Sequence, residues 1–134
     1  MIGRILRRKL QGLAEELLVE LGGEGRVRLL DPSANFFGLE SRGVWQVRGN
    51  GCLAVTADRV VFRQLAPRRD VVIPRERILA VEPVRWHLGK RRRHELLRIA
   101  WWGESVTDRA AWLLSRNLRR WLDELGAGAS GHGT

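Results

Sequence analysis

A series of short strands between residues 26 and 102 constrains the fold of this chain more than any other feature. In Arg59 to Leu65, the side chains of Val60 and Phe62 fall on one face, as they do in a half-buried strand. Val71 to Ile73 is a short apolar run of the same kind. Short strands at steady spacing, with turn residues between them, predict an all-β barrel or sandwich.

The strongest local turn signal in this region is Asn50-Gly51. It predicts a hairpin that joins a strand at Val44 to Arg48 with a return strand at Cys52 to Thr56. Before this hairpin we expect a weak strand at Val27 to Leu30. A long connection then follows from Ser33 to Gly43.

The first part of the chain predicts an amphipathic helix within residues 1–22, which Gly22 and Gly23 end. Its main apolar residues are spaced 4, 4, 3, 4 and 4 positions apart, which places them on one helical face: Ile2, Leu6, Leu10, Leu13, Leu17 and Leu21. The early turns are basic, although the helix dipole favours anions there: Arg4, Arg7, Arg8 and Lys9.

Two roles for this helix stay open. In the favoured interpretation, its leucine face packs on its own domain or on a twin subunit, so a homo-oligomer through this helix is an open prediction. In the alternative, the helix is interfacial: its basic residues bind anionic headgroups and its leucines lie below them.

A second helix is predicted from Thr107 or Asp108, either of which can cap its start, to Gly126. One face is apolar: Ala110, Ala111, Leu114, Leu118, Trp121, Leu122 and Leu125. The other face carries Arg109, Trp112, Arg116, Arg119 and Arg120. Trp112 and Arg116 are four residues apart, close enough for a cation–π contact. Residues 126–134 are predicted to be a disordered tail.

The stretch from Gly51 to Phe62 resembles a pattern in bacterial pleckstrin-homology-like (PH-like) domains of the GRAM type. That pattern is a glycine, an apolar strand ending in Thr, two turn residues, and then Arg-apolar-x-Phe. Ile73-Pro74 and Ile78 to Val81 follow in the order that is common in this family. The resemblance covers residues 26–125, and the N-terminal helix lies outside it.

This resemblance implies a bent, seven-stranded β-barrel that a C-terminal helix closes at one end. Members of the family bind phosphoinositides, other lipids or protein segments, and many only scaffold. Phosphoinositide-binding PH domains usually place Lys and Arg around the first hairpin. The corresponding connection here, Asp31 to Gly43, contains Glu40 and has Arg42 as its only cation, so it departs from the lipid-binding pattern.

The basic residues gather in a different hairpin, formed by strands at Ile78 to Leu88 and Glu95 to Trp102. Alternation predicts Trp86 in the core and places Arg85 and His87 on the opposite side. The predicted tip is basic: Lys90, Arg91, Arg92 and Arg93. Arginine forks and adjacent cations suit phosphate groups. The alternative is a solvated tip whose charges only prevent strand pairing with other chains.

The remaining features exclude several classes of protein. Lys and Arg number 24 and Asp and Glu 15, so the net charge is +9 and favours acidic partners. The single cysteine, Cys52, forms no internal disulfide, and this predicts a reducing, cytoplasmic setting. No membrane span, signal peptide, metal site or catalytic constellation is visible, so we expect neither a cofactor nor enzymatic activity.

The sequence therefore predicts a non-enzymatic binding or adaptor module. We expect its basic face to dock on a protein partner or on an anionic membrane surface, which would place it at the inner face of the membrane. The candidate residues are Arg85, His87, Lys90, Arg91, Arg92, Arg93, Trp112 and Arg116, with Arg4, Arg7, Arg8 and Lys9 of the N-terminal helix. The second hypothesis is nonspecific nucleic-acid binding by the basic hairpin and the Trp/Arg helix face. No small-molecule substrate is expected.

Overall fold

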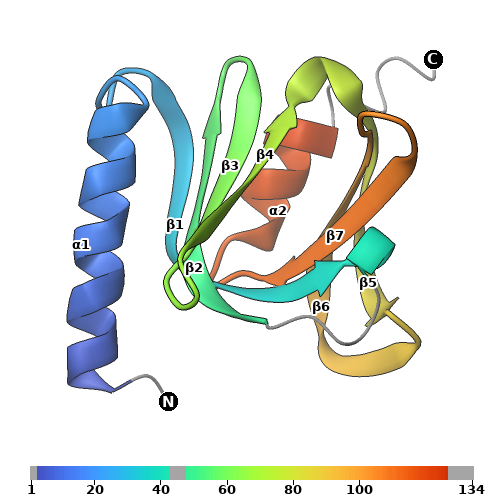
Figure 1. Ribbon diagram of the computed structural model, residues 1–134, viewed down its shortest axis with the longest axis horizontal. Helices are drawn as coiled ribbons and strands as arrows, with labels where there is room; N and C mark the ends of the chain where they lie inside the picture. Colours follow the sequence, from blue (N-terminus) through green and yellow to red (C-terminus); the bar gives the residue numbers. More distant parts are fainter. Residues whose placement is uncertain (1–2, 43–47, 127–134) are drawn as a thin grey trace.

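The computed structural model describes residues 3–42 and 48–126, and it is mainly β. A helix, α1 (Arg4–Glu20), precedes seven strands. The strands are β1 (Val27–Leu39), β2 (Gly49–Thr56), β3 (Arg59–Gln64), β4 (Arg69–Pro74), β5 (Ile78–His87), β6 (Lys90–Trp102) and β7 (Thr107–Leu113). A short helix, α2 (Leu118–Trp121), continues into a π-helical turn at Leu122–Gly126. Figure 1 shows α1 along one side of the sheet and α2 within the curve of the strands.

All seven strands belong to one antiparallel sheet with the order β4-β3-β2-β1-β7-β6-β5. The predicted closed barrel is wrong, because β4 and β5 are the two free edges of this open sheet. Pro74 ends β4, and a 3₁₀ turn at Arg75–Arg77 leads the chain away before β5 begins. Side-chain packing from the C-terminal helix, rather than strand pairing, fills the space between the two halves.

Strand β1 runs through both halves of the sheet, pairing first with β2 and then with β7. Its register shifts between Asp31 and Ala34, and again between Phe36 and Leu39. Gly38 lies in the second irregularity at φ 105°, a backbone conformation that favours glycine. The predicted connection after Ser33 is therefore mostly strand. It brings Phe36 into the core, where its ring packs against two other aromatic rings.

The predicted hairpin turn at Asn50-Gly51 is also wrong, since both residues lie inside strand β2. Both pair there with β1, and Gly51 also pairs with β3. A Cβ atom on Gly51 would lie 2.2 Å from the carbonyl oxygen of Arg63 and 2.7 Å from the Phe62 ring. Glycine at position 51 thus permits close strand packing rather than a turn. Most of the predicted strand at Val44 to Arg48 lies outside the described residues.

Helix α1 confirms the N-terminal prediction and packs on the outer face of the sheet (Figure 1). Leu13, Ala14 and Leu17 form a hydrophobic cluster with Cys52, Ala54 and Val61 of β2 and β3. Leu10 is buried as well. The leucine face is therefore occupied by the protein's own sheet.

Arg63 of β3 fixes the same helix electrostatically. Its guanidinium donates to both carboxylate oxygens of Glu20 at 2.8 Å and to Asp70 at 2.9 Å. Glu16 lies 3.3 Å away. The hydrogen bonds from Arg63 lower the pKa of the Glu20 carboxyl. The like-charged helix residues Glu16 and Glu20 thus share one cation.

The predicted long C-terminal helix is wrong at its start, because residues 107–113 form β7. In this strand Ala110 and Trp112 point into the core beside β1 and β6. Asn117 then turns the chain at φ 64°, and only the last turns are helical. Trp121 and Leu125 of those turns are buried in the core, so the short helix does cover the sheet. The predicted tail, apart from Gly126, lies outside the described residues.

Candidate functional site

The basic hairpin has a tighter turn than predicted. Strands β5 and β6 are joined by Leu88 and Gly89 alone, at φ 52° and 76°. Positive φ at both positions is the geometry of a type I′ hairpin turn. The predicted basic tip is therefore wrong in one respect: residues 90–93 are the first residues of β6, not a loop.

Most side chains of this segment are open to solvent. Lys90, Arg91 and Arg93 are exposed, and so is Arg85 on the partner strand. Arg85 donates a hydrogen bond of 2.6 Å to the carbonyl oxygen of Arg93, which fixes its position across the hairpin. The exposed guanidinium and ammonium groups can bind phosphate oxygens without moving any core residue.

Arg92 is held differently from its neighbours. Its guanidinium carbon lies 4.5 Å from the centre of the Phe37 ring, a cation–π distance. Its Nε and Nη2 atoms are buried and find no hydrogen-bond partner among residues 3–42 and 48–126. Burial, and to a smaller extent the charge of Arg48, lowers the pKa of Arg92. The charge of Arg48 therefore acts on Arg92 close to the turn of the hairpin.

The structure reverses the predicted orientations of Trp86 and His87. The register between β5 and β6 shifts between Val84 and Trp86, so the alternation changes phase there. Trp86 is 56% exposed, whereas His87 is 2% exposed. His87 Nε2 donates to the carbonyl oxygen of Gly38 at 2.8 Å, and burial lowers the pKa of the ring. His87 is thus a neutral structural residue and does not contribute to the basic surface.

Trp112 does not lie on an exposed helix face, so that prediction is wrong as well. It is fully buried on β7, where its ring centre lies 5.6 Å from that of Phe36 and 5.8 Å from that of Phe62. Arg116 is exposed and lines an open cleft of about 510 Å³ together with Arg85. The predicted Trp112–Arg116 surface is therefore absent from the described part of the protein.

The basic residues of α1 lie in its first turns and are exposed: Arg4, Arg7, Arg8 and Lys9. The N-terminal end of α1 and the β5–β6 turn both reach the lower end of the molecule in Figure 1. They lie on opposite sides of that end. We call this region the basic end and define it by Arg4, Arg7, Arg8, Lys9, Arg48, Arg85, Lys90, Arg91, Arg92 and Arg93.

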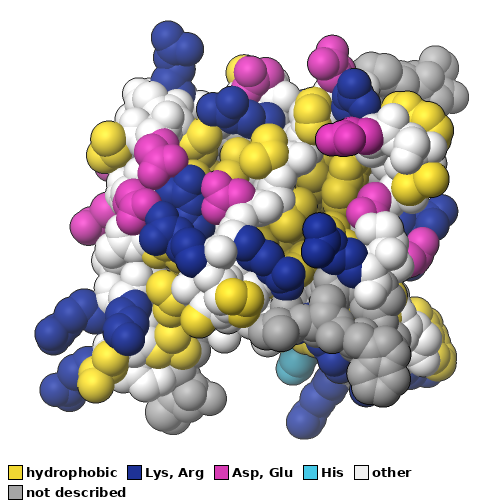
Figure 2. Space-filling view, in the orientation of Figure 1, with side chains coloured by type: hydrophobic (Ala, Val, Ile, Leu, Met, Phe, Trp, Pro, Cys, Tyr) yellow, Lys and Arg dark blue, Asp and Glu magenta, His cyan; other side chains and the backbone are white. Residues whose placement is uncertain are grey.

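Acidic residues gather elsewhere. Figure 2 shows Asp and Glu over the upper and middle parts of this face, among further Lys and Arg, whereas the Lys and Arg at its lower edge have no Asp or Glu beside them in this view. Within residues 3–42 and 48–126, the cations that form ion pairs are other arginines, such as Arg63, Arg75 and Arg98. No residue of the basic end forms an ion pair with a described carboxylate. The positive charge of the basic end is therefore not neutralised by the described part of the protein.

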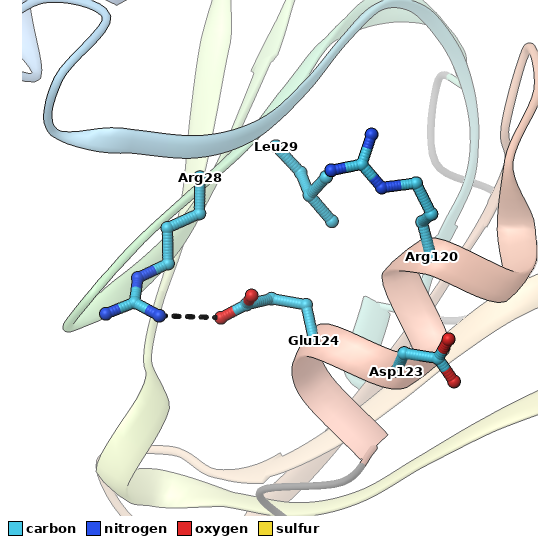
Figure 3. A pocket seen from close by; sticks show the side chains of 5 residues that line it. All are labelled: Arg28, Leu29, Arg120, Asp123 and Glu124. Carbon is cyan, nitrogen blue, oxygen red and sulfur yellow. Dashed lines mark hydrogen bonds and ion pairs between the residues drawn. The ribbon is translucent and has the colours of Figure 1, made fainter.

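A pocket between β1 and the C-terminal helix offers a different environment (Figure 3). It has a volume of about 280 Å³ and is lined by Arg28, Leu29, Arg120, Asp123 and Glu124. Arg28 and Glu124 pair across it at 3.4 Å, and Arg75 donates to the same carboxylate at 2.9 Å. Because its cations face carboxylates of its own lining, this pocket is a poorer anion site than the basic end.

No family model, curated protein or solved structure matches the chain. Fold and site thus define a protein with an open, seven-stranded antiparallel sheet, an outer helix and an unneutralised basic end. The described residues contain no His, Cys, Asp and Glu group suited to a metal ion. None of their helices has the length and apolar character needed to cross a bilayer.

Sequence reasoning did not identify Arg48 or the exposed side chains of Ile5 and Trp86 at this end. Ile5 is an apolar residue of the predicted helix, but its side chain is 74% exposed. A signal for Ile5 was present, since it lies among cations rather than on the line of leucines. No comparable signal existed for Trp86, because the register shift depends on pairing with β6.

Proposed function

We propose that this protein is a non-enzymatic binding module that docks on an anionic membrane surface through its basic end. One observation carries the proposal: cations from two segments about eighty positions apart in the sequence lie at the same end of the molecule (Figure 1). Their charges have no described carboxylate partners. We further propose that the open sheet and its covering helix are a PH-like fold.

The energetics favour a combined site over either segment alone. Each basic residue near an anionic membrane contributes about 1 kcal/mol, and the contribution is screened by salt. The exposed cations of the hairpin alone would give weak, salt-sensitive attachment. The basic turns of α1 add a second group, and because α1 packs on the sheet that also contains β5 and β6, the two groups can engage a surface together.

The shape of the basic end favours a broad surface. Its two groups lie on opposite sides of the molecule's lower end, so a flat, extended partner can touch both (Figure 1). A nucleic-acid strand needs stacking platforms beside the cations. Burial removes Trp112 from that role, and the exposed Trp86 lies beside the hairpin cations alone, so stacking gives no role to the basic turns of α1.

Parallel binding assays test this function. The full-length protein should sediment with vesicles containing phosphatidylserine or phosphatidylglycerol, and should not sediment with phosphatidylcholine vesicles. Binding should weaken steeply between low and physiological salt. The same protein is assayed against single-stranded nucleic acid. Preference for nucleic acid over anionic vesicles would replace the proposal, and binding to neither would leave a protein partner.

A further inference from the structure

Two large hydrophobic side chains project from the basic end. Ile5 is 74% exposed and Trp86 is 56% exposed. Other exposed hydrophobic residues of the described chain lie outside the basic end: Val19, Val72, Leu79, Trp102 and Val106. A purely electrostatic site gains nothing from exposed apolar groups, so these two side chains call for a separate role.

Trp86 is surrounded by cations. It pairs with Arg91 across the hairpin and follows Arg85 in the chain. The two-residue turn at Leu88-Gly89 begins two positions later. An indole ring carries an apolar body and a polar N–H group, and such rings concentrate where the hydrocarbon of a bilayer meets the headgroups. The hairpin thus presents an interfacial residue together with headgroup-binding residues.

Ile5 has the same setting on α1. It lies between Arg4 and Arg7 in the first turns, away from the buried line of Leu10 and Leu13. Side chains on a helix lean toward its N-terminus, so Ile5 and its basic neighbours incline toward the lower end of the molecule (Figure 1). The helix therefore offers an apolar group and cations to the same surface as the hairpin.

We propose that Trp86 and Ile5 enter the boundary between headgroups and acyl chains of an anionic bilayer. The surrounding cations bind the headgroups, so the protein is anchored at two separated points and held in one orientation. This inference rests on the proposed function and adds a specific partner chemistry: a surface that is anionic outside and apolar just beneath. Nucleic acid has no apolar layer of this kind.

The same elements supply matched controls. Trp102 is 47% exposed and lies at the opposite end of β6 from the hairpin turn. Val19 is 76% exposed and lies in the last turn of α1. Trp86→Ser can therefore be compared with Trp102→Ser, and Ile5→Ser with Val19→Ser. The tryptophan pair removes exposed apolar surface from the two ends of the β5–β6 hairpin, and the Ile5–Val19 pair removes it from the two ends of α1.

The experiment measures the affinity of full-length protein and these four variants for anionic vesicles, at low salt and at 0.5 M salt. Trp86→Ser and Ile5→Ser should each weaken binding about tenfold or more, which is the expected loss of one buried apolar side chain. They should also remove the binding that survives high salt. Trp102→Ser and Val19→Ser should stay within about twofold of the parent protein. Far-ultraviolet circular dichroism and thermal melting check that all four variants are folded.

A second readout detects insertion directly. Bromine-labelled acyl chains in anionic vesicles should quench tryptophan fluorescence of the parent and of Trp102→Phe, and should quench Trp86→Phe much less. If Trp86→Ser and Ile5→Ser bind like the parent while binding remains salt-sensitive, insertion is refuted and the electrostatic function stands. If the parent binds no anionic vesicle, both the insertion and the proposed function are refuted.

Discussion

Individual side chains show most clearly how this protein differs from its sequence pattern. Trp86 and His87 exchange the positions that alternation predicts, because a register shift after Val84 changes the phase of β5. Nothing in the local sequence marks that shift, since it depends on how β5 meets β6. The exchange removes a histidine from the basic surface and places an indole there.

His87 provides a test through pH. Burial lowers its pKa below the ordinary value of about 6.5, so the folded protein holds a neutral ring. When the pH falls through that value, the unfolded chain takes up a proton that the folded state excludes. The stabilising contribution is therefore present above pH 6.5 and is lost as the pH falls toward the folded-state pKa.

We expect His87→Gln to reduce this dependence, because glutamine cannot titrate and can still donate to the Gly38 carbonyl oxygen. Urea unfolding between about pH 7.5 and 5.5 measures it. His94→Gln is the control, since His94 is exposed and lies on the same hairpin. A parent protein whose stability does not fall relative to His87→Gln over this range would contradict the buried, neutral assignment.

Among whole elements, α1 was predictable and β7 was not. The leucine spacing in α1 fits one helical face, and the structure buries that face as expected. Residues 107–114 carry both periodicities, because the spacing of Ala110 and Leu114 suits a helix while that of Ala110 and Trp112 suits a strand. This segment forms a strand because it pairs with β6 on one side and with β1 on the other. Such long-range pairing cannot be recognised from a short stretch of sequence.

The packing of α1 can be tested through Cys52, which lies beneath the helix. The thiol is fully buried, and burial raises its pKa to about 12. The parent protein should therefore react slowly with a thiol reagent. Leu17→Ala should lower the free energy of unfolding by about 2–5 kcal/mol and speed labelling, because it opens a cavity against the cysteine's cluster.

Leu79→Ala serves as the control, since Leu79 of β5 is 57% exposed and its loss should cost less than about 0.5 kcal/mol. If Leu17→Ala is as stable as this control and Cys52 stays equally unreactive, α1 does not pack on the sheet as described.

Across the whole molecule, the distribution of charge matters more than its sum. The net charge of +9 was evident from composition, and both basic segments were identified as candidates. Their arrangement at one end required the fold, because the length and direction of α1 and of β5 and β6 determine where these segments lie (Figure 1). The arrangement of acidic residues in ion pairs away from this end likewise depended on tertiary contacts.

We propose that the two basic segments act together on one anionic surface. The test measures affinity for anionic vesicles at low salt with three variants. The first changes Arg4, Arg7 and Arg8 to Ser, and the second changes Lys90, Arg91 and Arg93 to Ser. The third combines all six substitutions. Each triple should weaken binding by up to about 3 kcal/mol, or about 100-fold, and the combined variant should lose detectable binding. A charge-matched control with Arg59, Arg119 and Arg120 changed to Ser should bind nearly as well as the parent, and all variants should melt as it does. If either basic triple binds like this control, the two segments do not share a surface and the claim is wrong.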